Sequence, residues 1–265
     1  MYTLKNQEEI GLMKESGAIL IEVFRRVGAF IEPGVTTADV NEVVDRTIRE
    51  FGATPNFLGV GDPPYPAASC VSLNDEIVHG IPSPDRFIKD GDIVSVDIGA
   101  NLGGWQSDAC RTFMVGSVSP EVQKLVEVTE QCFWLGLAEA VPGKRLGDIG
   151  HAVQRHAERH GYSVVRELTG HGIGRELHED PTVLNYGKPG RGLRLYAGMT
   201  LALEPMINMG RKEIAMESDD GWTIVTEDGS YSAHYENSFA VTDDGPILLT
   251  CNESLADKLA EIPAF

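Results

Sequence analysis

The sequence predicts an α+β protein in which two similar α/β halves pack around a central antiparallel sheet. Two observations support this prediction. A pair of helices occurs twice along the chain at a constant offset, and a strand that ends in a carboxylate recurs at nearly the same offset. No linker-like stretch separates the copies. We therefore expect a single domain of the size of an enzyme, 1–265, with internal halves at approximately 7–118 and 119–250.

The first helix pair is predicted from apolar spacing and from residues that begin and end helices. Apolar side chains recur at helical intervals from Gln7 to Ile31, and a Pro-Gly pair follows shortly afterwards. Thr37 is the expected N-cap of the second helix. Gly52 stands where a C-cap glycine belongs, so this helix should end there.

The second helix pair begins with Ser119 as N-cap and Pro120 as the first helical residue. Its first helix should stop before Pro142, and its second should run from near Asp148 to Gly161. These features repeat those of the first pair at an offset of 109 residues.

The repeat continues into the strands, because segment 91–97 aligns with segment 198–204 at an offset of 107 residues. Each aligned segment ends in a carboxylate. A period this long exceeds the roughly 20–50 residues of a solenoid unit, so we expect two copies related by a pseudo-twofold axis. Chance similarity of two Pro-Gly-helix stretches is the alternative.

Charge and composition disfavour several classes of function. The chain has 22 Lys and Arg against 40 Asp and Glu, a net charge of −18, and no basic run that would bind phosphate. We therefore expect neither a nucleic-acid partner nor a membrane surface. No segment approaches the roughly 18 apolar residues of a membrane span, and no signal peptide is evident, so a cytoplasmic location is expected. The four cysteines lack Cys-x-x-Cys spacing and are predicted to be free thiols.

A β-hairpin with two acidic residues is the first candidate functional feature. We expect a strand at Ile93–Ala100, a turn at 101–104 and a returning strand at Trp105–Val115. Asp97 and Asp108 would then face each other directly, with Cβ atoms about 4.5–5.5 Å apart. Opposed carboxylates repel, and a metal cation between them is the simplest remedy. Solvated acids on an exposed hairpin are the alternative.

The second half contains matching acids and candidate imidazoles. One strand ends in Glu204, and segment Tyr231–Val241 is its expected return strand, with Glu236 in the position equivalent to the acid of the first return strand. His171 lies in a Gly-His-Gly-Ile-Gly segment, where glycines let backbone approach a site closely, and His178 follows seven residues later. A structural histidine is the alternative for each.

Four carboxylates and one imidazole suit a pair of divalent cations, because four negative charges neutralise two such ions. Oxygen-rich ligands favour Mn, Fe, Co or Zn over Cu(I). In dinuclear sites the ions lower the pKa of a water molecule towards about 7. We therefore expect two divalent metal ions per chain.

In order and in local context, these five residues resemble the ligand signature of the methionine aminopeptidases. The likeness is to the type I, bacterial-style enzymes, which have the pita-bread fold. It covers nearly the whole chain and rests on four motifs in order: Val78-His79-Gly80-Ile81-Pro82, Gly170-His171-Gly172-Ile173-Gly174, Leu203-Glu204-Pro205-Met206 and Tyr235-Glu236-Asn237. The resemblance implies a metal-dependent aminopeptidase that removes the N-terminal methionine from nascent proteins with a small second residue.

The resemblance also implies a role for each ligand. Asp97 would bind one metal through both oxygens, Asp108 and Glu236 would bridge the two metals, and His171 and Glu204 would complete the other metal's coordination. In this interpretation a hydroxide attacks the first peptide carbonyl while Glu204 relays protons.

Further residues would bind the substrate. By the same resemblance, His79 and His178 stabilise the scissile amide and the tetrahedral intermediate. Tyr65, Cys70 and Trp222 match positions that wall the methionine pocket in the family.

Two expected pocket positions depart from the family's pattern. Asp62 and Leu177 stand where relatives usually have aromatic residues, which leaves the chemistry intact and changes the shape of the pocket. Asn74, Glu76 and Ser232 correspond to a monovalent-cation site of similar enzymes.

Two other classes remain as alternatives. A proline-directed aminopeptidase or prolidase resembles this chain in its ligands but usually carries a large additional N-terminal domain. A metal-free binding protein of the same fold would have lost ligands, whereas all five are present here. We expect a monomer that acts on the N-termini of nascent polypeptides, close to the ribosome, although no N-terminal extension for ribosome docking is evident.

Overall fold

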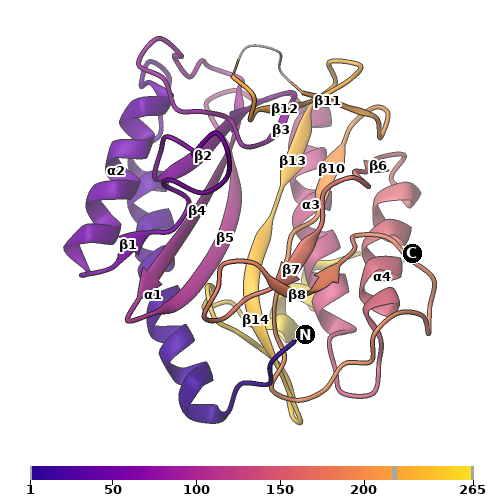
Figure 1. The fold of residues 1–265 in the computed structure, drawn as a ribbon. Helices are drawn as coiled ribbons and strands as arrows, with labels where there is room; N and C mark the ends of the chain where they lie inside the picture. Colours follow the sequence, from indigo (N-terminus) through magenta and orange to yellow (C-terminus); the bar gives the residue numbers. More distant parts are fainter. Residues whose placement is uncertain (1, 217–219, 264–265) are drawn as a thin grey trace.

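The computed structural model describes residues 2–216 and 220–263. A curved antiparallel sheet occupies the centre of the molecule (Figure 1). Helices α1 and α2 pack on the strands of the N-terminal part, and α3 packs on strands of the C-terminal part with α4 beside it (Figure 1). The described helices are α1 (Gln7–Phe30), α2 (Thr37–Glu50), α3 (Pro120–Ala138), α4 (Leu146–Arg159) and α5 (Leu255–Glu261).

Local capping determines where the helices begin. Thr36, not Thr37 as expected, is the N-cap of α2, because its hydroxyl accepts a hydrogen bond from the Asp39 backbone N–H at 3.1 Å while the Asp39 carboxylate accepts from the Thr36 N–H at 2.8 Å. Helix α4 starts two residues before Asp148, whose carboxylate accepts from the Arg145 backbone N–H at 2.8 Å. The predicted cap at Ser119 is confirmed.

The main sheet has the strand order β1-β4-β5-β14-β9-β7-β8, with β2 paired to β4 and β15 paired to β14. Strands β5 and β14 are therefore neighbours at its centre, and every pairing is antiparallel. Its strands are β1 (Thr54–Pro55), β2 (Ser69–Leu73), β4 (Ile93–Leu102), β5 (Trp105–Met114), β7 (Gly170–Gly172), β8 (Glu179–Val183), β9 (Thr200–Leu203), β14 (Glu236–Thr242) and β15 (Gly245–Leu248).

Two three-stranded sheets accompany the main sheet. One has the order β13-β10-β6 and the other β11-β12-β3. Their strands are β3 (Glu76–Val78), β6 (Ser163–Val164), β10 (Met206–Asn208), β11 (Ile214–Met216), β12 (Ile224–Thr226) and β13 (Ser232–His234).

The β4–β5 hairpin is present, but its register differs from the prediction. Asp97 lies opposite Cys110, and Asp108 lies opposite Gly99. The turn takes only Gly103 and Gly104, which both have positive φ (59° and 82°), whereas a four-residue turn was expected. The pairing is shifted by two residues, so the two acids remain on one face as diagonal neighbours.

The predicted return strand at 231–241 is interrupted, since the structure has β13 and β14 with Tyr235 between them. The break faces Pro205, which separates β9 from β10 on the partner segment. Proline has no N–H for a strand ladder, and the Tyr235 N–H instead donates to the Pro205 carbonyl oxygen at 3.2 Å. Both partners therefore change sheets at the same point, beside Glu204 and Glu236.

The cores of the two parts lie between these helices and the sheet. One cluster includes Leu20, Val44 and Ile98, and the other includes Phe133, Trp134 and Phe239. The four cysteines are buried free thiols, as predicted. Among the described residues, no helix is both long enough and apolar enough to cross a membrane.

Two glycines of α1 give a matched test of its packing. A Cβ at Gly17 would lie 2.0 Å from the Leu249 carbonyl oxygen, whereas a Cβ at Gly11 has no atom within 4 Å. We expect Gly17→Ala to destabilise the protein by about 1–3 kcal/mol through overpacking. Gly11→Ala should stabilise it by about 0.5–1 kcal/mol through helix propensity. Urea unfolding measures both, and equal effects would contradict this account of the contact.

Candidate metal centre and active site

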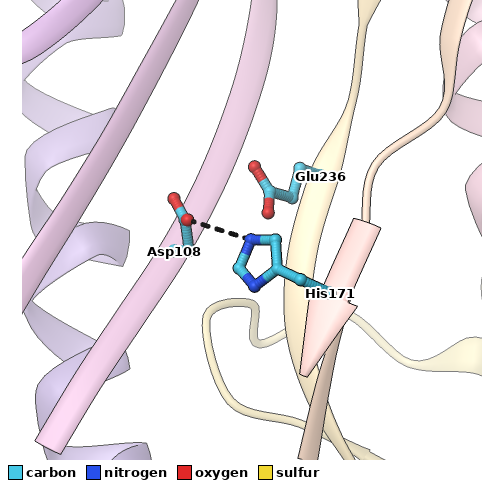
Figure 2. A group of neighbouring side chains, drawn as sticks. All are labelled: Asp108, His171 and Glu236. Atoms are coloured by element: carbon cyan, nitrogen blue, oxygen red, sulfur yellow. Dashed lines mark ion pairs between the residues drawn. The ribbon is translucent and has the colours of Figure 1, made fainter. Parts of the chain in front are cut away.

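The five predicted ligand residues converge on one cavity of about 160 Å³ in the middle of the molecule. They come from separate strands of the main sheet: Asp97 from β4, Asp108 from β5, His171 from β7, Glu204 directly after β9, and Glu236 as the first residue of β14. Figure 2 shows the side chains of Asp108, His171 and Glu236 pointing toward one another.

The donor atoms in this cavity lie at spacings that a cation can span. Ligand atoms of Asp108, His171 and Glu236 all lie within 4.8 Å of one another. His171 Nε2 is 3.6 Å from Asp108 Oδ2 and also 3.6 Å from Glu204 Oε1. The remaining acid, Asp97, lines the same cavity.

Several carboxylate oxygens in the cavity are buried without a hydrogen-bond partner among the described residues: Asp97 Oδ1, Asp108 Oδ1 and Glu236 Oε1. Burial raises the pKa of all three side chains and of Glu204, and repulsion between the acids adds to this for Asp97, Glu204 and Glu236. An unpartnered buried carboxylate is costly. Divalent cations would neutralise these charges and would be coordinated by the oxygens that have no hydrogen-bond partner. The residues therefore fit the predicted metal.

The imidazole of His171 is oriented as a metal ligand. Its Nδ1 lies 2.8 Å from the Gly172 carbonyl oxygen, which can only accept, so Nδ1 carries the proton. Burial lowers the pKa of His171, and the neutral ring therefore directs the Nε2 lone pair toward Asp108 and Glu204. A backbone acceptor on the far nitrogen is the usual second-shell arrangement for a metal-binding histidine.

The glycines beside His171 allow neighbouring backbone to approach. A Cβ at Gly170 would lie 2.4 Å from the Ala202 carbonyl oxygen, and one at Gly172 would lie 2.2 Å from the Asp180 carbonyl oxygen. Only glycine fits at either position, so the Gly-His-Gly sequence lets β7, which carries the imidazole, pair closely with β9 and β8.

His79 and His178 line the same cavity. The ring of His178 stands edge-on to that of His171, with centroids 4.4 Å apart. Desolvation lowers the pKa of His178 to about 4 and also lowers that of His79, so both rings are neutral at pH 7. His79 has a positive φ of 62°, which for a non-glycine residue signals a backbone held by its surroundings.

The apolar wall contains the expected Tyr65, Cys70 and Trp222. The indole of Trp222 packs edge-on against Tyr65, at a centroid distance of 5.2 Å, and against His79, at 5.8 Å. Phe57 and Val60 also line the cavity. These two residues are not predictable from the sequence, because they lie in an irregular loop where apolar side chains follow no regular spacing.

Of the two residues that depart from the family's pattern, Leu177 and Asp62, only the first lies at the cavity. Leu177 lines the cavity. Asp62 does not, because it is exposed in the loop that precedes Tyr65. The backbone at Gly61 lies against the Trp222 ring, where a Cβ would come within 2.4 Å, and the following residue turns outward.

The three residues expected to hold a monovalent cation lie on adjacent segments. The Ser232 N–H donates to the Asn74 carbonyl oxygen at 2.8 Å. The Glu76 side chain accepts from the Leu73 N–H at 2.8 Å and pairs with Arg86. Asn74 and Ser232 are thus brought together, while the Glu76 carboxylate is already engaged within the protein.

One further histidine lies beside the centre. His234 Nε2 is 4.0 Å from Glu204 Oε2 and is buried. Its position two residues before Glu236 was the only signal in the sequence, and no motif drew attention to it.

A buried, acid-rich centre with a neutral imidazole whose Nε2 lone pair faces the acids is typical of metal-dependent hydrolases. In agreement, the model of metallopeptidase family M24 matches residues 11–243. The methionine aminopeptidase of Clostridium acetobutylicum is 48% identical over 96% of this chain and 100% of its own length. Methionine aminopeptidase 1 of Bacillus subtilis is 44% identical over 94% of this chain and 99% of its own. The chain therefore belongs to metallopeptidase family M24 and, within it, to the methionine aminopeptidases.

Solved structures confirm the fold prediction. The crystal structure of methionine aminopeptidase from Rickettsia prowazekii superposes with a TM-score of 0.92 at 39% identity, covering 95% of this chain and 100% of that one. The α+β class, the pita-bread fold and the resemblance to type I enzymes are thus confirmed.

The likeness to a prolidase is a likeness of fold. Prolidase from Pyrococcus furiosus has a TM-score of 0.76 at 22% identity, and the match covers 95% of this chain but 66% of the prolidase. The metal-free alternative does not fit a cavity in which three buried carboxylate oxygens have no partner in the part of the chain that the structure describes.

The raised pKa values of the four acids predict how metal affects stability. An acid whose pKa is raised by folding costs stability once it ionises, so the metal-free protein should lose stability as pH rises above about 4. Bound divalent cations need deprotonated ligands and reverse this trend. We expect Mn²⁺ or Co²⁺ to raise the melting temperature of chelator-treated protein more at about pH 7.5 than at about pH 5.5.

Differential scanning fluorimetry measures this shift. Asp108→Asn should reduce it, whereas Asp85→Asn, which removes an exposed acid outside the cavity, should leave it unchanged. A metal-induced shift that is the same at both pH values would contradict the prediction.

Proposed function

We propose that this protein is a metal-dependent aminopeptidase that removes the N-terminal methionine from proteins with a small second residue. The observation that carries the proposal is a single cavity in which unpartnered buried carboxylates face a largely apolar wall. The names of the close relatives support it.

The five ligands would hold two divalent ions, of the class Mn, Fe, Co or Zn. Asp97 would bind one ion, Asp108 and Glu236 would be shared, and His171 and Glu204 would bind the other. Ions held there would polarise the peptide carbonyl and lower the pKa of a water molecule to near neutrality.

The chain's own groups then bind the substrate and move protons. Glu204 is a largely buried carboxylate with a raised pKa, so it is suited to accept a proton from the attacking water and pass it to the leaving amine. His178 and His79 are neutral at the cavity, so the ring N–H of His178 can donate to the substrate carbonyl oxygen, and the ring lone pair of His79 can accept from the scissile N–H.

The apolar wall would receive the methionine side chain. Tyr65, Cys70 and Trp222 give it an aromatic and thiol surface, and Leu177 contributes an aliphatic one. The two histidines at the cavity leave little space for the second residue, which would restrict it to small side chains.

We further propose the cellular setting and the internal organisation. The substrates are N-termini of nascent polypeptides, met by a monomeric cytoplasmic enzyme near the ribosome. The chain is one catalytic domain whose halves, about 7–118 and 119–250, arose by duplication. Helices α2 and α4 begin and end 109 residues apart, in support of this.

A monovalent cation near Asn74, Glu76 and Ser232 is part of the same proposal. Asn74 has a positive φ of 55°, and its carbonyl oxygen is adjacent to Ser232. With the Glu76 carboxylate engaged by Arg86, backbone oxygens would be the ligands.

A panel of peptides tests the proposed activity. Metal-reconstituted protein should cleave Met-Ala-Ser, leave Met-Leu-Ser intact because a large second side chain does not fit, and leave an Ala-Pro peptide intact. Liquid chromatography with mass detection follows the release of the first residue. Cleavage of the Ala-Pro peptide in preference to Met-Ala-Ser would favour a proline-directed enzyme, and turnover after verified metal removal would contradict metal dependence.

The aliphatic residue at 177 predicts weaker discrimination for methionine than an aromatic would give. A sulfur–aromatic contact contributes about 0.3–1.5 kcal/mol, and a leucine cannot supply it. We expect Leu177→Phe to raise the ratio of kcat/KM for Met-Ala-Ser over Leu-Ala-Ser by up to about tenfold. Leu177→Ile is the matched control and should leave the ratio near its original value. An unchanged ratio in the phenylalanine variant would mean that Leu177 does not contact the methionine side chain.

A further inference from the structure

The side chain of His234 is the least explained group near the metal centre. It is only 1% exposed, and its Nε2 has no hydrogen-bond partner among the described residues. It is neither one of the five proposed metal ligands nor part of the cavity lining. A buried imidazole nitrogen without a partner is costly, so its position beside the centre calls for an explanation.

The backbone of His234 is fixed by the strands that carry the acids. The hydroxyl of Thr112 on β5 donates to the His234 carbonyl oxygen at 2.8 Å and accepts from the His234 N–H at 3.0 Å. The hydroxyl of Ser95 on β4 lies 2.8 Å from that of Thr112. The imidazole therefore projects from a backbone position that the main sheet determines.

The backbone at Glu204 is fixed as well. The Asn185 side-chain amide donates to the Glu204 carbonyl oxygen at 2.9 Å, and the Tyr235 N–H donates to the carbonyl oxygen of the next residue, Pro205, at 3.2 Å. Tyr235 directly follows His234, so the two segments are joined by a backbone hydrogen bond. Only side-chain torsions remain free to adjust the distance between the imidazole and the carboxylate.

The two oxygens of Glu204 face different imidazoles. Oε1 is 3.6 Å from His171 Nε2, and Oε2 is 4.0 Å from His234 Nε2. His171 carries its proton on Nδ1 and presents a lone pair to the cavity. An ionised carboxylate oxygen can only accept, so the tautomer of His234 that suits its position carries the proton on Nε2.

We propose that His234 is a positioning residue that donates a hydrogen bond from Nε2–H to Glu204 Oε2 and thereby turns Oε1 toward the metal site. The distance of 4.0 Å is about 1 Å beyond an ordinary N–H···O bond, so the proposal requires a rotation of one of the two side chains. This inference rests on the proposed metal-dependent function. It assigns to His234 the role of an outer-shell partner of a ligating carboxylate, a kind of contact whose loss typically weakens metal binding by about 10- to 100-fold.

Two amide substitutions test the proposal because they differ only in reach. In His234→Gln the amide N–H₂ occupies the position of the imidazole Nε2, whereas in His234→Asn it falls one bond short. We expect the Gln variant to bind Mn²⁺ within about threefold of the unmodified protein and the Asn variant to bind it at least about tenfold more weakly. Isothermal titration calorimetry on chelator-treated protein measures the Kd.

His156→Gln is the matched control for loss of a buried imidazole. His156 is 4% exposed, lies on α4 and hydrogen-bonds to Gln131 through Nε2. This variant should keep the Mn²⁺ Kd of the unmodified protein. Circular dichroism and melting temperatures of the metal-free forms identify the variants that fold. The Kd values of the Gln and Asn variants at position 234 are then compared at a temperature at which both are folded.

Each result has one meaning. Equal Kd values for the Gln and Asn variants, whether both near that of the unmodified protein or both weakened, would overturn the positioning role. The Co²⁺ visible spectrum adds a second readout: a spectrum unchanged in His234→Gln supports an outer-shell role, and loss of its intensity pattern would overturn it in favour of direct ligation. Absence of Mn²⁺ binding by the unmodified protein would instead refute the metal-dependent function itself.

Discussion

The burial of four carboxylates in one cavity is the constraint on which the rest of this structure depends. Acids so close together repel, and one oxygen each of Asp97, Asp108 and Glu236 has no hydrogen-bond partner among the described residues. A fold that tolerates this arrangement needs a rigid frame and a compensating positive charge. The central strands β5 and β14 supply the frame, since each carries an acid and each is hydrogen-bonded to neighbours on both sides.

Glycines and a proline, which are unusual in strands, position the other groups of the site. Glycines at 170 and 172 let β7 approach β8 and β9 closely enough to insert an imidazole between the acids. Pro205 breaks the ladder next to Glu204, and the opposing break at Tyr235 brings His234 and Glu236 to the same end of the sheet. Glu204 and Glu236 thus lie where regular pairing stops, whereas Asp97 and Asp108 lie within the regular β4–β5 ladder.

Much of this was predictable from sequence, for identifiable reasons. Capping residues and helical spacing located α1 to α4, and ordered motifs drew attention to the four acids and the imidazole proposed as ligands. The hairpin register was not predictable, because it depends on whether Gly103 and Gly104 form the whole turn. Phe57 and Val60 lie in a loop without periodicity, and the approach of His234 to Glu204 arises from pairing between segments distant in sequence.

The shifted register of the hairpin also determines the chemical surroundings of Asp97. Its partners on the two adjoining strands are Cys70 and Cys110, so sulfur flanks the acid on both sides. Burial raises the pKa of both thiols well above the ordinary value, and the nearby acids add to this. A protonated thiol is a weak nucleophile and a weak ligand. The sheet therefore places protonated, weakly nucleophilic sulfur on both sides of one acid of an oxygen-rich centre.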